Sequence, residues 1–144
     1  MRSPHEPTRT PARVTFDQML ERIRYEGAYP TRERAEAVTR AVLSGLGRQL
    51  TGAERADLAA CLPAEAALPL TAQTPESDQL TGWGFVKDLA ARTGGTPATA
   101  RWDTGAVLAT VGHLAGPDLL DRVLARLPAG YALLFGRAEL IQAA

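Results

Sequence analysis

The chain has 144 residues, with 16 basic and 16 acidic side chains that give no formal net charge at pH 7. A chain of this length can fold alone, as one domain or as two half-domains around a shared core, and its balanced charge excludes a global field that would attract nucleic acid or an anionic membrane. The single Cys61 excludes an internal disulfide and a cysteine-only zinc site, and there is no run of about 18 apolar residues that could span a membrane, so we expect a soluble cytoplasmic protein.

The first helix is predicted to follow a disordered tail. Residues 1–14 contain three prolines and show no apolar period, which is typical of a disordered segment. Thr15 then provides an N-cap hydroxyl for a helix that ends near Gly27. The apolar residues of this helix recur at the spacing of one helix face: Phe16, Met19, Leu20 and Ile23.

A second helix is predicted over residues 32–47. It follows a turn at Tyr29-Pro30-Thr31, in which Thr31 serves as the N-cap. Its buried stripe consists of Ala35, Val38, Val42, Leu46 and Leu50. The segment Thr51-Gly52-Ala53-Glu54 has the form of a capping box, so a third helix is predicted to start there.

The third helix must end before Pro63, because the proline ring disfavours a helical conformation in the residue before it. Pro63 is also well suited to begin a new helix, since its missing amide hydrogen would have no partner there. Leu62-Pro63-Ala64 therefore predicts a helix-to-helix corner. The fourth helix is expected to cover residues 64–68 and to end at Pro69.

The remaining helices follow a polar linker at residues 70–80. Phe85, Val86, Leu89 and Ala90 form the apolar face of the next helix, and a turn is predicted at residues 93–97. Three further helices are predicted at residues 100–114, 117–127 and 129–135. No segment alternates with period two over more than a few residues, so we expect no strands.

An internal duplication is indicated by the return of Leu62-Pro63-Ala64 as Leu127-Pro128-Ala129, 65 positions later. At the same offset, Ala41-Val42-Leu43 pairs with Ala106-Val107-Leu108. The sequence therefore predicts an all-α fold in which two tandem repeats of about four helices each pack into one bundle-like domain. The predicted segments are a tail (1–14), a first repeat (15–69), a linker (70–80), a second repeat (81–136) and a C-terminal tail (137–144).

Few residues of the folded region are suited to chemistry. His113 lies near the end of a predicted helix, where a cation favours the helix dipole, and Arg48 occupies the equivalent position of the first repeat, so we interpret His113 as a capping residue. Cys61 corresponds to Arg126 of the second repeat, which indicates an outward-facing position and not an activated nucleophile. The sequence predicts no catalytic residue, no set of metal ligands and no cofactor site.

An aromatic residue and four arginines gather around the first predicted turn between helices: Arg22, Arg24, Tyr29, Arg32 and Arg34. This composition is found at nucleic-acid and protein interfaces. Interleaved glutamates would neutralise most of the charge, so we favour a salt-bridged solvent face. Trp83, on a glycine-flanked turn, would mark a contact surface if its ring is exposed.

A set of helix-packing residues resembles the DUF2267 family of bacterial proteins, in particular its actinomycete members: Phe16, Ala41-Val42-Leu43, Arg48, Leu50 and Leu62-Pro63. The resemblance extends from about Val14 to Phe135. It implies an all-α fold of tandem helical repeats and brings no agreed activity, cofactor or catalytic residue. Cys61 departs from the family pattern, in which a polar residue such as glutamine is expected.

These features favour a non-enzymatic protein-interaction module that binds an unknown protein partner or a second copy of itself. One alternative is a nucleic-acid-binding protein that uses the arginine-rich turn and the basic tail. Another is an enzyme or ligand-binding protein with a pocket between the repeats. We expect no membrane partner.

Overall fold

The computed structural model of the chain describes residues 14–137, which form eight α-helices and no strand. This result confirms the all-α prediction. The tails predicted at 1–14 and 137–144 lie outside the described residues, apart from Val14 and Arg137. No helix within the described range is long and apolar enough to cross a membrane. The helices are α1 (Phe16–Gly27), α2 (Arg32–Gln49), α3 (Gly52–Ala60), α4 (Ala64–Thr71), α5 (Gly82–Thr93), α6 (Pro97–Ala115), α7 (Pro117–Arg126) and α8 (Tyr131–Leu134).

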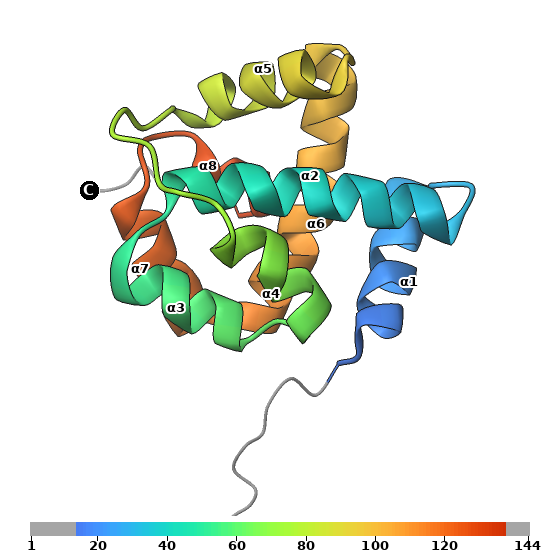
Figure 1. Cartoon of the computed structure of the whole chain (residues 1–144), viewed down its shortest axis with the longest axis horizontal. Coiled ribbons are helices and arrows are strands. Elements are labelled where there is room, and N and C mark those ends of the chain that lie inside the picture. Colours follow the sequence, from blue (N-terminus) through green and yellow to red (C-terminus); the bar gives the residue numbers. More distant parts are fainter. Residues whose placement is uncertain (1–13, 138–144) are drawn as a thin grey trace, which may run out of the picture.

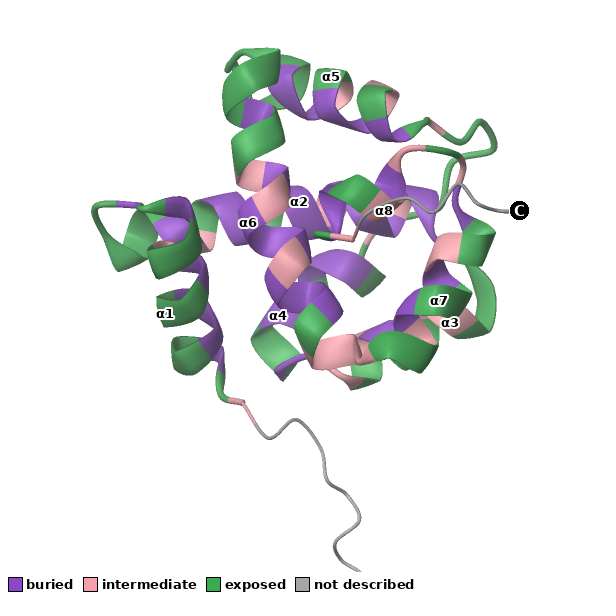
Figure 2. Cartoon of the chain, turned by 180° about the vertical axis from the view of Figure 1, so that it is seen from behind, coloured by how far each residue is buried: buried purple, intermediate pink, exposed green. Residues whose placement is uncertain are grey.

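The two long helices α2 and α6 cross at the centre of the molecule, and the other helices surround them (Figure 1). Val42 and Leu46 of α2 and Val107 and Val111 of α6 are fully buried. Buried residues concentrate on these two helices, whereas the outer helices expose one face to solvent (Figure 2). All eight helices contribute side chains to a single hydrophobic cluster.

The helices α1 and α5 each contact both central helices: α1 lies against α2 and α6, and α5 lies against α6 and α2. Each begins at a threonine N-cap. Thr15 Oγ1 accepts the Gln18 amide at 3.1 Å, and Thr81 Oγ1 accepts the Gly84 amide at 3.1 Å. Since α1 and α5 pack across the two halves of the chain, neither half completes its core without the other.

Both predicted Leu-Pro corners are turns between helices. Leu62 is buried between the end of α3 and the start of α4, and Leu127 is buried between α7 and α8. Pro63 is the N-cap of α4 and lacks an amide hydrogen that would need a partner. The corner prediction is confirmed, although α8 is a short helix of four residues and not the 129–135 helix expected.

The predicted capping box at Thr51 is wrong, because the Thr51 side chain makes no cap hydrogen bond. Gly52, the first residue of α3, adopts a left-handed φ of 74°, which few other residues tolerate and which differs from the backbone of a regular helix start. Glu54 faces α7, where its carboxylate pairs with Arg126 at 3.0 Å and Arg122 at 3.7 Å. The acidic residue of the motif therefore links two helices.

Two predicted helix limits are also wrong. Pro69 lies inside α4, which continues to Thr71, because Pro69 and Leu70 are buried where α4 packs on α2 and this burial offsets the missing backbone hydrogen bond. α6 begins at Pro97, three residues earlier than expected. Thr96 caps it through a hydrogen bond from the Thr99 amide, and proline is favoured at the first helical position.

Candidate functional site

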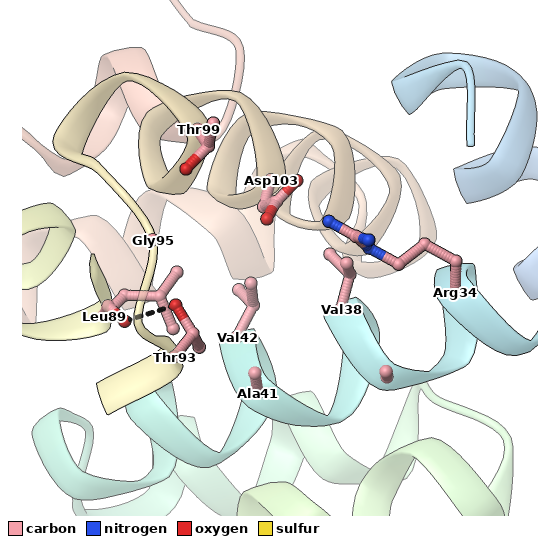
Figure 3. A pocket seen from close by; sticks show the side chains of 10 residues that line it. Arg34, Val38, Ala41, Val42, Leu89, Thr93, Gly95, Thr99 and Asp103 are labelled. Carbon is pink, nitrogen blue, oxygen red and sulfur yellow. Dashed lines mark hydrogen bonds between the residues drawn. The ribbon is translucent and has the colours of Figure 1, made fainter. Parts of the chain in front are cut away.

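A cleft of about 360 Å³ opens between α2 and the turn that joins α5 to α6 (Figure 3). Its lining comes from one face of α2, the last turns of α5, Gly95 in the turn and the first turns of α6. The volume lies at the lower end of the range of roughly 300–1,000 Å³ that small-molecule sites occupy. The cleft is therefore large enough for a small ligand.

The floor of the cleft is apolar. Val38 and Val42 line it, and they lie on the same face of α2 as Arg34 because the three residues are spaced by four. Leu89 of α5 lies across from them. Val38, Val42 and Leu89 are all buried, so the floor belongs to the hydrophobic core.

One wall carries Asp103 of α6, whose carboxylate has a fixed position. The Tyr29 hydroxyl donates a hydrogen bond to Asp103 Oδ1 at 2.6 Å. The Tyr29 ring is itself buried, and it packs so closely on Gly27 that a Cβ there would lie 2.1 Å from a ring carbon. Burial, with the hydrogen bond to Asp103 and its negative charge, raises the pKa of Tyr29 well above its ordinary value. The phenol therefore keeps its proton and acts as the donor.

The facing wall carries Arg34, in the first turn of α2. The Arg34 amide is bonded to the Thr31 hydroxyl at 3.1 Å, which sets the start of the helix. Its guanidinium extends along the cleft towards the side on which Asp103 lies (Figure 3). Within residues 14–137, the Arg34 side chain forms neither a hydrogen bond nor an ion pair. A cation and an anion thus face the same cleft without pairing.

Two threonine hydroxyls at the other end of the cleft serve local structure. Thr93 Oγ1 donates to the Leu89 carbonyl at 2.9 Å (Figure 3). Thr99 Oγ1 donates to the Thr96 carbonyl and accepts from the Thr96 amide, both at 3.0 Å. Arg34 and Asp103 therefore supply the strongest polar interactions that the cleft can offer.

The residues that line the cleft can hold and orient a molecule. The lining contains no histidine, cysteine or serine, and its two threonine hydroxyls donate to nearby backbone carbonyls. Within the described part of the chain, no group of three or more His, Cys, Asp or Glu side chains could hold a metal ion. The cleft thus presents one positive and one negative side chain, Arg34 and Asp103, above an apolar floor.

In the arginine-rich turn the four arginines are exposed or partly exposed, whereas the tyrosine is not. Tyr29 is buried, and three of the four arginines pair with neighbouring carboxylates: Arg22 with Glu26, Arg24 with Glu21, and Arg32 with Asp17. These pairs offset the positive charge of three of the four arginines. Arg34 is the member of the group that lines the cleft.

Trp83 is exposed, with 57% of its surface accessible at the first turn of α5. The Lys87 ammonium lies 5.6 Å from the centre of its ring, within cation–π distance. Trp102 is equally exposed, but its indole nitrogen donates to the Gly27 carbonyl at 2.9 Å and so ties α6 to α1. Tyr131 and Phe135 are buried in the core.

The surroundings of His113, Arg48 and Cys61 are typical of structural residues and not of reactive ones. His113 is exposed in the last turn of α6. Arg48 is largely enclosed and lies within 4.0 Å of Glu76 and 3.9 Å of Asp88, so it joins α2 to the linker and to α5. Burial, with the nearby Asp57 charge, raises the pKa of the Cys61 thiol, which disfavours the reactive thiolate.

Asp103 is the site residue that the sequence did not reveal. It lies in the second turn of α6 without any motif around it, and its partner Tyr29 is 74 positions away. An aspartate three residues before the apolar run Ala106-Val107-Leu108 is the one local signal of its position. The sequence did identify Arg34 and Tyr29, but as parts of a surface.

Comparison with known proteins places the chain in a family. A family model described as "Uncharacterized conserved protein (DUF2267)" matches residues 16–134, and no curated protein matches the chain. The matched residues begin at the first residue of α1 and end at the last residue of α8, so they include all eight helices and every residue of the cleft. The chain therefore belongs to the DUF2267 family.

Proposed function

We propose that this chain is a non-enzymatic protein-interaction module whose contact surface is built around Trp83. The observation that carries the proposal is the exposure of the Trp83 ring at the start of α5. Tryptophan is enriched among the few residues that contribute most of the free energy of protein association. An exposed indole on a folded helix is therefore a strong candidate for a contact residue.

The backbone that presents Trp83 is held in place, which supports this role. The Gly82 amide donates to the Ala129 carbonyl at 2.8 Å, and a Cβ on Gly82 would lie 2.6 Å from the Gly130 backbone. The start of α5 is thus packed directly on the turn between α7 and α8. A contact residue on a fixed backbone loses less conformational entropy on binding than one on a mobile loop.

A second exposed apolar side chain lies on α8, the helix that follows the turn on which the start of α5 packs. Leu133 on α8 is 55% exposed and follows Gly130 by three residues. The Lys87 ammonium beside the Trp83 ring adds a positive charge. These features fit a protein partner that offers an apolar pocket for the indole and a carboxylate for Lys87.

The test uses the purified chain as bait, together with two variants. Trp83→Ala should lose at least about tenfold in affinity for the captured partner, as expected of an interface hot spot. Tyr25→Ala is the matched control, because Tyr25 is an aromatic residue with 84% exposure and lies on a different helix. Analytical ultracentrifugation of the same proteins shows whether the partner is a second copy of the chain. Equal capture by wild type and Trp83→Ala would refute this surface.

We also propose that residues 15–69 and 81–136 are two copies of one helical unit. The equivalent Leu-Pro corners support this, as does the reciprocal packing in which α1 contacts α6 while α5 contacts α2. If the copies are equivalent, residues 14–80 alone should pair as a dimer, with each copy covering the other as the second half covers the first. A fragment that is folded and monomeric would contradict the proposal.

A further inference from the structure

We propose that the cleft between α2 and the α5–α6 turn binds a small carboxylic acid that carries a hydrogen-bond donor beside its carboxylate and an apolar tail, as hydrophobic 2-amino acids and 2-hydroxy acids do. This inference is independent of the protein contact proposed at Trp83. The two sites lie at opposite ends of α5, since Trp83 is in its first turn and Thr93 is its last residue.

The unpaired charges of the cleft indicate which polar groups the ligand carries. Arg34 has no side-chain partner among residues 14–137, and a guanidinium binds a carboxylate with two parallel hydrogen bonds. Asp103 uses Oδ1 to accept the Tyr29 hydroxyl, and in the described residues its Oδ2 has no partner. A carboxylate on Arg34 and an adjacent hydroxyl or ammonium group on Asp103 would satisfy both side chains.

The position of Asp103 is set before any ligand arrives. Its oxygen is bonded at 2.6 Å to a phenol that is buried and closely packed on Gly27. A polar group held in this way gives more affinity than a free side chain, because little conformational entropy remains to be lost on binding. The hydrogen bond also leaves Oδ2 as the acceptor for a ligand donor.

The apolar floor of the cleft indicates that the rest of the ligand is apolar. Val38, Val42 and Leu89 line it, together with two alanines of α2. These side chains can bury an aliphatic or small aromatic group but offer it no hydrogen bond. The volume of about 360 Å³ limits the ligand to a small molecule.

The test titrates the full chain with four probes of similar shape while amide chemical shifts are followed by NMR. L-Leucine and 2-hydroxy-4-methylpentanoate contain all three groups, 4-methylpentanoate lacks the donor, and 3-methylbutylamine lacks the carboxylate. We expect one or both of the first two probes to shift the amides of Val38, Val42 and Gly95 at millimolar concentration. The stronger of the two identifies the donor as ammonium or hydroxyl.

Two substitutions test the roles of the charged residues. Arg34→Gln should weaken binding of the complete probe about tenfold to hundredfold, because it removes a charged hydrogen-bond partner. Asp103→Asn keeps an oxygen for the Tyr29 hydroxyl, and it should weaken the complete probes without weakening 4-methylpentanoate. Arg101→Gln is the control, since Arg101 is an exposed arginine of α6 outside the lining, and it should bind as wild type does.

Two results would overturn the inference. One is the absence of shifts at the cleft with all four probes, and the other is unchanged affinity in Arg34→Gln. Trp83→Ala should bind the probes as wild type does, so loss of the protein contact and loss of the small-molecule site can be told apart. Far-UV circular dichroism of each variant confirms that it is folded.

Discussion

Tyr29 connects the first turn of the chain to the cleft. Its ring is buried against Gly27, and its hydroxyl bonds to Asp103 on a helix 74 positions away. The sequence placed Tyr29 among arginines on a polar turn, and this neighbourhood predicts exposure. The glycine two residues earlier makes the difference, because it leaves room for the ring to fold back on the helix end.

Burial of Tyr29 predicts a loss of stability in alkaline solution. The unfolded phenol loses its proton near its ordinary pKa of 10, whereas the folded phenol has a raised pKa and keeps the proton to higher pH. Above pH 10 the unfolded state therefore binds fewer protons, and the free energy of unfolding must fall as the pH rises. Tyr29→Phe should reduce this slope by up to about 1.4 kcal/mol per pH unit.

Urea denaturation at a series of pH values between 9 and 11 measures this slope. Tyr29→Phe should also lower stability by about 1 kcal/mol below pH 9, because it removes the hydrogen bond to Asp103. Tyr25→Phe, at a side chain that is 84% exposed, provides the control and should retain the wild-type slope. A slope in Tyr29→Phe equal to that of wild type would mean that the phenol is not buried in solution.

The buried leucines of the two Leu-Pro corners are expected to contribute strongly to the stability of the fold. Leu62 and Leu127 are both buried at these corners, so Leu62→Ala and Leu127→Ala should each reduce the free energy of unfolding by about 2–5 kcal/mol through cavity formation. Leu68→Ala is the control, because Leu68 is 64% exposed and its truncation should change stability by less than about 0.5 kcal/mol. If both corner variants were as stable as Leu68→Ala, the corners would not be part of the core.

At the scale of elements, a contact between two helices can reverse the effect on stability that helix propensity predicts for a glycine. Gly47 and Gly105 lie inside the two central helices, where propensity alone favours alanine by about 0.5–1 kcal/mol. A Cβ on Gly47 would lie 2.1 Å from the Leu70 carbonyl oxygen of α4, and backbone cannot move aside easily. A Cβ on Gly105 would meet only the end of the Arg101 side chain, which is flexible.

Gly47→Ala should therefore destabilise the chain by about 1–3 kcal/mol, whereas Gly105→Ala should stabilise it by about 0.5–1 kcal/mol. Thermal unfolding followed by circular dichroism gives both values. The two substitutions have the same chemistry and both lie within helices, so opposite signs would locate the effect in the α2–α4 contact. Equal signs would show that α4 does not approach α2 so closely.

Helix starts were predictable where the signal is local. Thr15 and Thr31 cap α1 and α2 as expected, because a threonine hydroxyl and an amide three residues later belong to one turn. Thr51 and Pro69 were misjudged for the opposite reason. Glu54 pairs with arginines of α7, and Pro69 is buried where α4 packs on α2, so distant segments decided both local structures.

At the scale of the whole molecule, the halves share one core. α1 packs on α6 and α5 packs on α2, and a single cluster includes side chains from every helix. A half without its partner would expose these apolar surfaces to water. We therefore expect the chain to unfold in one cooperative transition.

Tryptophan fluorescence and far-UV circular dichroism test this expectation. Trp83 reports on the second half and Trp102 on the contact of the second half with Gly27, whereas circular dichroism reports on all helices. The two signals should give the same urea midpoint. An earlier loss of one signal would indicate that the halves unfold independently.

The sequence by itself determined the helical class, most helix starts, the two Leu-Pro corners and the residues of the apolar stripes. These features depend on periodicity and on hydrogen bonds within about four residues, and both are contained in the local sequence. The tertiary structure alone decided the burial of Tyr29, its hydrogen bond to Asp103, the approach of Gly82 to Gly130 and the cleft beside Arg34. Each of these depends on contacts between residues dozens of positions apart, and such contacts follow from how the helices cross and not from the sequence around any one of them.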